Sequence, residues 1–469
     1  MRVAQVSVVL VLCLLAVSPP GHAQAPAPAG PPAGSTPPPT AASRVVGRVL
    51  SLEEAIGIAL ETQPLIQARL ADYMAASHRV DQAFAPLLPQ LTGSWDIART
   101  QNVERGRSPS SFRIVGVAPN QQVETVQGSR RTTTSIREPG ENMSATVSLT
   151  QLIFDFGKTF ASTEAARRLA EQAQEDVELQ RQLITLTVKE SFININFARR
   201  LIRVQEQALE RADLNLRSAR GFFEVGTRPK SDVARAEVDV ANARVDLIRA
   251  RNAERLARVA LNTAMGIPAD TLTEVQDILV YEAMTIDRAQ LLSQALAQRP
   301  EYKQARLRVD EADARMRRAF RDFFPDITAN GFYGGARSDL NEIWEVGVAL
   351  SWSLFDGGNR IARLRETKAT VEAEKARVRA TELDISREVE QAQLNVAEAQ
   401  ERIAAAQTAV ASAQENFRLA QGRFDAGVGT ILELTDAQLF LTQAQNTETQ
   451  ALADYRIAVA RLERAIGRR

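Results

Sequence analysis

The sequence predicts a mostly α-helical chain with a small β part, built as two tandem copies of a β-hairpin plus a long coiled-coil helical hairpin. Three observations predict this fold class. The second half repeats the first at an offset of 201 residues, each half contains a very long stretch without proline, and each half contains two short segments of alternating polarity. A repeat of this length means that both halves follow one structural plan.

The repeat is clearest at two short motifs. A Phe-Asp-x-Gly motif at residues 154–157 returns at 355–358, and an aromatic-x-x-Gly motif at 223–226 returns at 424–427. We therefore expect one repeat over residues 49–267 and a second over residues 268–469.

The N-terminal segment has the features of an exported protein. Residues 1–23 combine an early arginine, an apolar run and a small-residue cleavage site, which predicts a signal peptide. Residues 24–48 are rich in proline and alanine and predict a disordered leader. The single cysteine, Cys13, lies in the signal peptide, so we expect a mature chain without disulfides or cysteine chemistry.

The charge composition argues against a nucleic-acid partner. The 57 Lys and Arg residues are balanced by 57 Asp and Glu residues, whereas nucleic-acid-binding domains usually show a basic excess. His78 is the one histidine outside the signal peptide, and no ligand or catalytic residue is spaced near it. The sequence therefore predicts no enzyme, no cofactor and no metal site.

Two stretches predict helices of unusual length. Residues 158–220 and 359–421 lack proline, and apolar residues follow a 4-3 spacing that ends at Phe223 and Phe424, with Ser191 and Gln205 as polar exceptions in the first stretch. At 1.5 Å per residue, such a helix is on the order of 95 Å long, and the seven-residue period predicts coiled-coil packing against the next helix. The helical pattern alone is equally compatible with an ordinary soluble coiled coil. The expected helices are residues 64–88, 156–221, 229–265, 300–324, 358–422 and 430–466.

Four short segments predict strands with one apolar and one polar or small face. All three tryptophans, Trp95, Trp344 and Trp352, fall in these segments, as expected for the aromatic girdle of a transmembrane barrel. A soluble sheet with its tryptophans in a core is the alternative. The expected strands are residues 90–99, 142–153, 326–335 and 343–354.

Four strands cannot close a barrel, and open sheet edges are not tolerated in lipid. A membrane form of this chain must therefore oligomerise. Two copies would supply eight strands with a filled interior, and three copies would supply twelve strands with room for a passage.

These features resemble the TolC-like outer-membrane efflux protein family, also called outer membrane factors. The resemblance rests on the two motifs, on their duplication, and on prolines at 64 and 89 that return with the same spacing at 300 and 325. It implies a trimeric 12-stranded barrel in the outer membrane of a Gram-negative-type cell, continued by an α-helical tunnel into the periplasm. It also implies an equatorial belt, to which residues 52–60 and 272–298 would contribute.

The resemblance implies an exit duct for a tripartite efflux or type I secretion system. Its partners would be two further copies of the chain, a periplasmic adaptor protein, an inner-membrane transporter and outer-membrane lipid. The transported substrate and the class of transporter are left open. The implied adaptor-docking residues at the helical-hairpin tips are Phe223, Gly226, Thr227, Phe424, Gly427 and Val428.

The resemblance also implies a narrow periplasmic entrance. Glu433 and Asp436 match the acidic residues that constrict it, and three copies would form two carboxylate rings that favour cations. Gly429 departs from the basic or polar residue that often helps to latch the entrance. The two halves also differ at residues 99–141, an insertion that predicts a long extracellular loop.

Two rival functions remain at this stage. One is an exported soluble periplasmic coiled-coil scaffold or adaptor that never enters lipid. The other is a duct dedicated to metal cations, which the acidic pair Glu433 and Asp436 permits but does not require.

Overall fold

The structure is a computed structural model. It describes residues 47–100, 103–107, 132–136, 140–282, 288–336 and 340–468. Within these ranges, only the backbone is described at 98–142 and 283–289. The predicted signal peptide and residues 24–46 of the predicted leader lie outside the described residues.

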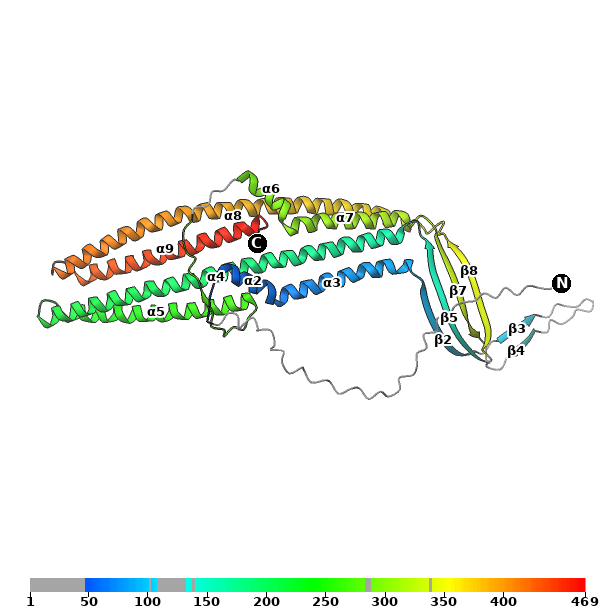
Figure 1. The fold of residues 1–469 in the computed structure, drawn as a ribbon, viewed down its shortest axis with the longest axis horizontal. Helices are drawn as coiled ribbons and strands as arrows, with labels where there is room; N and C mark the ends of the chain where they lie inside the picture. Colours follow the sequence, from blue (N-terminus) through cyan, green and yellow to red (C-terminus); the bar gives the residue numbers. More distant parts are fainter. Residues whose placement is uncertain are drawn as a thin grey trace, which may run out of the picture.

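The molecule is a long helical rod with a β-sheet at one end (Figure 1). Two helical hairpins form the rod, and their longer helices each contain 67 residues, a length of about 100 Å at 1.5 Å per residue. Both hairpin turns lie at the end of the rod away from the sheet. The hairpins are α4 (Lys158–Glu224) with α5 (Lys230–Met265), and α8 (Asn359–Asp425) with α9 (Ile431–Ala465).

Shorter helices complete the half of the rod nearest the sheet. α3 (Pro64–Phe84) lies along α4 and continues into a 3₁₀ turn (Ala85–Leu87), and α7 (Pro300–Arg321) lies between α4 and α8. Part-way along the rod lie α2 (Leu52–Thr62), α6 (Arg288–Gln298) and a parallel bridge of β1 (Val49–Leu50) with β6 (Glu274–Val275). Among the described residues, no helix is long and apolar enough to cross a membrane.

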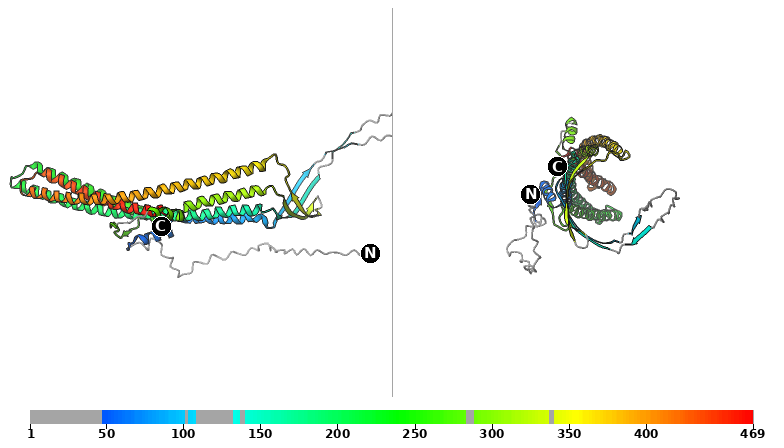
Figure 2. Two further views of the ribbon diagram at one scale, coloured as in Figure 1. Left: turned by 90° about the horizontal axis from the view of Figure 1, so that it is seen from above. Right: turned by 90° about the vertical axis from the view of Figure 1, so that its right-hand side faces the viewer.

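The sheet joins the two halves of the chain. Its order is β2-β5-β7-β8 and all neighbours are antiparallel, so β5 of the first half pairs with β7 of the second. Seen along the rod, the sheet is a curved arc with β2 and β8 at its edges (Figure 2). The strands are β2 (Gln90–Thr100), β5 (Gly140–Phe154), β7 (Asp326–Ala336) and β8 (Asn341–Ser351).

The described residues of the insertion at 99–141 include two further strands. These are β3 (Val103–Arg107) and β4 (Thr132–Ile136), which pair antiparallel beyond the sheet. These five-residue strands have no alternation of apolar and polar residues that would predict them from the sequence.

The Phe-Asp-x-Gly motif starts each long helix. The carboxylate of Asp155 accepts hydrogen bonds from the backbone N–H of Gly157 (2.8 Å) and of Thr159 (2.6 Å), and Asp356 does the same one repeat later. Gly157 and Gly358 are the N-cap residues, with φ of 85° and 87°. Aspartate satisfies the free N–H groups at the helix start, and glycine accepts the left-handed backbone.

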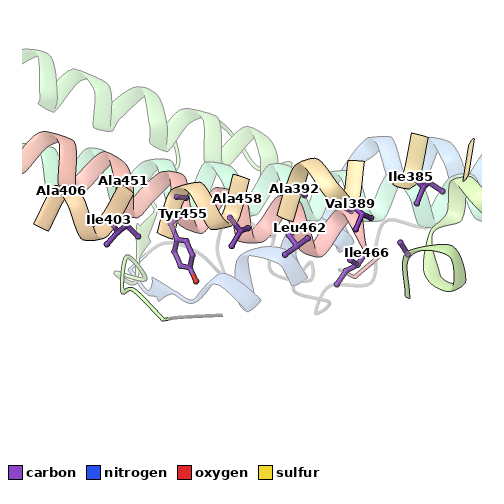
Figure 3. Close-up of a cluster of buried hydrophobic side chains, with 14 residues drawn as sticks. Ile385, Val389, Ala392, Ile403, Ala406, Ala451, Tyr455, Ala458, Leu462 and Ile466 are labelled. Atoms are coloured by element: carbon purple, nitrogen blue, oxygen red, sulfur yellow. The ribbon is translucent and has the colours of Figure 1, made fainter. Parts of the chain in front are cut away.

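Within each hairpin, the apolar residues at 4-3 spacing form a buried seam. In the second hairpin this seam alternates large and small side chains of α8 and α9, among them Val389, Ala392, Tyr455 and Ala458 (Figure 3). Alanine opposite a large side chain lets the two helices approach closely, as in other coiled coils.

The contact between the two hairpins includes a series of polar side chains. The side-chain amide of Asn215 on α4 donates to Gln438 on α9 (2.7 Å), and Gln438 donates in turn to the carbonyl oxygen of Ala208 (3.1 Å). Gln205, a polar exception in the apolar pattern of α4, is buried and donates to Asn446 (3.4 Å).

Candidate functional site

One face of the sheet is apolar and exposed. Cross-strand partners point to the same side of a sheet, and the register places Leu91 opposite Leu149, and Tyr333 opposite Trp344. On β8 this face exposes Val346 by 80%. Its apolar residues are Leu91, Trp95, Ile97, Ala145, Val147, Leu149, Ile327, Ala329, Tyr333, Trp344, Val346, Val348 and Leu350.

The opposite face of the sheet carries hydroxyl and small side chains. Ser94 and Thr146 are hydrogen-bonded across β2 and β5 (2.8 Å). This face continues into a cavity of about 910 Å³ between α3, α4, α7 and α8. Acidic and basic side chains such as Lys158, Glu311 and Arg315 line its wall. A transmembrane barrel strand has this arrangement, apolar towards lipid and polar towards the interior.

The predicted interface tryptophans lie at two levels of the apolar face. Trp95 and Trp344 lie towards the outer part of the strands, and Trp352 lies at the helix end, where its Nε1–H donates to the carbonyl oxygen of Phe323 (3.1 Å). The eight residue steps from Trp344 to Trp352 span about 27 Å along a strand, or about 21 Å of height at a tilt of about 40°. The apolar band of such a barrel is about 25 Å tall.

The two helical tips expose different apolar side chains. In the first tip Phe223 is 43% exposed beside the exposed Val225, and in the second tip Val428 is 72% exposed. Thr227, Gly226 and Gly427 are also exposed.

Phe424 differs from the other predicted docking residues because its ring is buried. It is 1% exposed and packs with Phe222, Ile431 and Leu434 inside the tip. Its position at the end of the 4-3 apolar pattern is the sequence signal that it belongs to the core. The ring of Phe424 is therefore not part of the exposed surface of the tip.

A contact between the tips was not foreseen. The guanidinium of Arg228 in the first tip lies over the ring of Phe424 (4.8 Å) and donates to the carbonyl oxygen of Gly429 in the second tip (2.6 Å). Gly429 is buried, and a Cβ there would lie 2.9 Å from the backbone nitrogen of Phe424. Glycine at this position is thus required by the close approach of the chain, and Arg228 joins the two hairpins.

The two predicted entrance carboxylates share one exposed face of α9. Glu433 lies in the first turn, where its backbone N–H donates to the capping hydroxyl of Thr430 (3.2 Å), and its carboxylate pairs with Arg423 (3.4 Å). Asp436 is exposed one turn further along. Arg423 is a partner that we did not anticipate. Within the described residues, no group of three or more His, Cys, Asp or Glu side chains could hold a metal ion.

The sequence profile of one family matches most of the chain. The profile described as outer membrane efflux protein matches residues 55–267 and 291–468, that is, both repeats. This chain belongs to the outer membrane efflux protein family. Members of this family are outer-membrane proteins, and the fold class predicted from the sequence is confirmed by the described helices and strands and by the solved structures below.

Two similar proteins are a secretion protein and an outer membrane protein. The chain is 26% identical over 337 residues to the alkaline protease secretion protein AprF of Pseudomonas aeruginosa, a match that covers 69% of this chain and 65% of AprF. It is 22% identical over 433 residues to the outer membrane protein TolC of Vibrio cholerae, covering 89% of this chain and 90% of that protein. The match to AprF thus spans slightly less than two thirds of that relative's length.

Solved structures of similar fold cover nearly the whole chain. The CusC structure aligns with a TM-score of 0.73 at 18% identity, over 89% of this chain and 92% of CusC. A membrane protein from Pseudomonas aeruginosa aligns with a TM-score of 0.72 at 21% identity, over 90% and 91% of the two chains. The outer membrane protein VceC from Vibrio cholerae aligns with a TM-score of 0.69 at 20% identity, over 89% and 96%.

Proposed function

We propose that three copies of this chain form the outer-membrane exit duct of a tripartite efflux or type I secretion system. The observation that carries the proposal is the four-stranded sheet, which exposes a continuous apolar face and ends at two unpaired edges, β2 and β8. In lipid these edges must be paired, and pairing β8 of one copy with β2 of the next closes a barrel.

The polar face and the long helices favour three copies over two. The cavity of about 910 Å³ behind the polar face is lined by charged side chains, which suits a water-filled interior. Eight strands would enclose only packed side chains, whereas twelve leave a passage. In the trimer the helices α3, α4, α7 and α8 would continue the barrel as a tunnel wall into the periplasm.

The tips are the proposed docking surface for a periplasmic adaptor, which would connect the duct to an inner-membrane transporter. Exposed apolar side chains without a partner at the end of a rod favour a protein contact there. Phe223, Val225 and Val428 supply this surface, with Gly226 and Gly427 giving close backbone access.

The proposed entrance constriction is the pair Glu433 and Asp436. Three copies would place six carboxylates around the axis at the tip, where they would attract cations and repel anions. We expect the double variant Glu433→Gln with Asp436→Asn to lose most of the cation selectivity of the duct in planar bilayers.

The matched control for that experiment is Glu224→Gln with Asp425→Asn. It also removes two exposed carboxylates at the tips, from equivalent positions of the two repeats that are not on α9. An equal loss of selectivity in both variants would show that the general charge of the tips, and not this pair, controls entry. Recovery of the protein as a soluble periplasmic species would refute the duct itself, for which we expect a heat-modifiable trimer in the outer membrane.

A further inference from the structure

A cavity on the outer wall of the rod lies where the helices meet the sheet. Its volume is about 440 Å³, within the range of small-ligand sites. It lies on the side of α7 opposite the charged interior cavity, because the two cavities are lined by different faces of that helix. Its lining residues are Phe156, Met316, Arg317, Phe320, Arg321, Phe324, Leu364 and Lys368.

The wall of this cavity continues the apolar face of the sheet. Phe154, at the end of β5, is paired with Ile327 of that face. From Phe154 an unbroken series of ring contacts leads into the cavity: to Phe156 (4.8 Å between centroids), then to Phe324 (5.2 Å), then to Phe320 (6.1 Å). These rings therefore connect the apolar face of the sheet with the cavity.

Phe156 is held in a backbone conformation that phenylalanine seldom adopts. Its φ is 55°, whereas the equivalent position of the second repeat is Gly357 with φ of 68°. A bulky residue in the left-handed region is an outlier, and such outliers are concentrated at functional sites. The first repeat thus has an aromatic ring at the wall of the cavity, at a position where glycine would be free of strain.

The rim of the cavity is basic. The guanidinium of Arg321 donates to the carbonyl oxygen of Gly157 (2.6 Å), which fixes its orientation. Arg317 is paired with Asp313 one turn earlier on α7. The ammonium group of Lys368 is exposed and has no ion-pair partner among the described residues. An apolar wall with an excess of positive charge at its edge is complementary to an amphiphile with an anionic head.

We propose that this cavity binds a glycerophospholipid of the periplasmic leaflet. The acyl chain lies against Phe156, Phe320 and Phe324, and the phosphate lies between Lys368 and the two arginines of the rim. A free phosphate ion would use the rim alone and would gain nothing from the three phenylalanines of the wall. The inference rests on the membrane placement within the proposed function, and it is independent of adaptor docking and of entrance selectivity.

The first test removes the charge of the rim. The purified trimer is delipidated in detergent and titrated with phosphatidylglycerol, and bound lipids are counted by native mass spectrometry. We expect Lys368→Gln with Arg317→Gln to weaken binding about tenfold, since charge-assisted hydrogen bonds to phosphate are lost. The control is Arg379→Gln, on the same face of α8 and three turns from Lys368, for which we expect no change.

The second test removes the ring without introducing strain. We expect Phe156→Gly to fold and trimerise normally, because glycine accepts the positive φ, and to lose phosphatidylglycerol binding. The control is Phe160→Ala, an exposed phenyl group one turn along α4 that does not line the cavity.

Three results would overturn the proposal. The first is unchanged lipid binding in both cavity variants. The second is inorganic phosphate alone saturating the rim, with equal affinity in wild type and Phe156→Gly, because this would make the site an anion site. The third is dissociation of the trimer in Phe156→Gly, because the cavity would then be covered by a neighbouring copy. A wild-type trimer without conductance in planar bilayers would refute the proposed duct but would leave the lipid titration interpretable.

Discussion

At the middle of the rod, each repeat forms a contact between the residue before a helix-starting proline and the end of its last helix, and we call this contact the joint. The side chains at the joint differ in chemistry between the two repeats. In the first repeat Gln63 precedes the proline that starts α3, and its side-chain amide donates to the carbonyl oxygens of Thr263 (2.9 Å) and Ala264 (2.8 Å) at the end of α5. In the second repeat Arg299 precedes the proline that starts α7, and its guanidinium pairs with Glu301 (2.9 Å) and Glu388 (2.7 Å).

The backbone follows the same path at the joint in both repeats, whereas the side chains differ. Each repeat ends its last helix with a glycine at positive φ, Gly266 at 73° and Gly467 at 83°, in close contact with the residues before the proline. The duplicated sequence thus retained the positions that fix the chain path. The first joint satisfies helix carbonyls with a neutral amide, whereas the second buries ionic groups.

The ionic joint is held by four charges. Arg464 on α9 pairs with the same two carboxylates as Arg299, at 2.6 Å from Glu301 and 3.3 Å from Glu388. Burial alone would raise the pKa of Glu301, but hydrogen bonds from Arg299 and the charges of both arginines outweigh burial, and the pKa is lowered. Arg299 is 2% exposed, so its loss leaves carboxylates in a poorly hydrated site.

The largest expected effect comes from breaking this ionic joint. We expect Arg299→Met to lower the free energy of unfolding by about 3 kcal/mol, the lower end of the range for breaking a buried ion pair, because Arg464 still pairs with both carboxylates. The equivalent change in the first joint, Gln63→Ala, should cost about 1 kcal/mol, the usual contribution of neutral hydrogen bonds. Urea denaturation in detergent measures both. Equal costs would mean that the two joints are energetically equivalent despite their chemistry.

A second comparison concerns the tips. We expect Phe424→Ala to destabilise the tip locally by about 3 kcal/mol, as for other buried phenylalanines, and to increase amide hydrogen exchange over the residues around Gly429. Phe223→Ala removes an exposed ring and should leave exchange unchanged, while it weakens binding of the adaptor. Weaker adaptor binding in Phe424→Ala without increased exchange would show that Phe424 belongs to the docking surface.

The smallest expected effect is on how far the melting temperature falls in acid. We expect this fall to depend on the ionic joint of the second repeat and not on the neutral joint of the first. Because the folded pKa of Glu301 lies below its ordinary value of 4.5, its stabilising contribution is present above that pH and is lost as the pH falls through the lowered pKa. We expect Glu301→Gln to show a smaller drop in melting temperature between pH 7 and pH 3.5 than wild type. Gln63→Ala should retain the wild-type drop, and an equally reduced drop there would contradict the assignment to Glu301.

Several features of the candidate site could be predicted because they depend on local periodicity. The alternation of apolar and polar residues in β8 predicts an apolar face, and this face is exposed in the structure. The 4-3 spacing predicts the buried seams and includes Phe424, so the burial of this ring follows from the periodicity. The positions of Glu433 and Asp436 on one helix face followed from their spacing, whereas the pairing of Glu433 with Arg423 did not.

The fold class and the family could be predicted from the sequence, because helix period, strand period and a 201-residue duplication are properties of consecutive residues. Which distant segments meet is known only from the three-dimensional structure. The pairing of β5 with β7, the contact of Arg228 with Gly429 and the strained Phe156 in the outer cavity each join residues that no local pattern connects. Their geometry follows from how the two repeats pack against each other, and a repeat period contains no information about that packing.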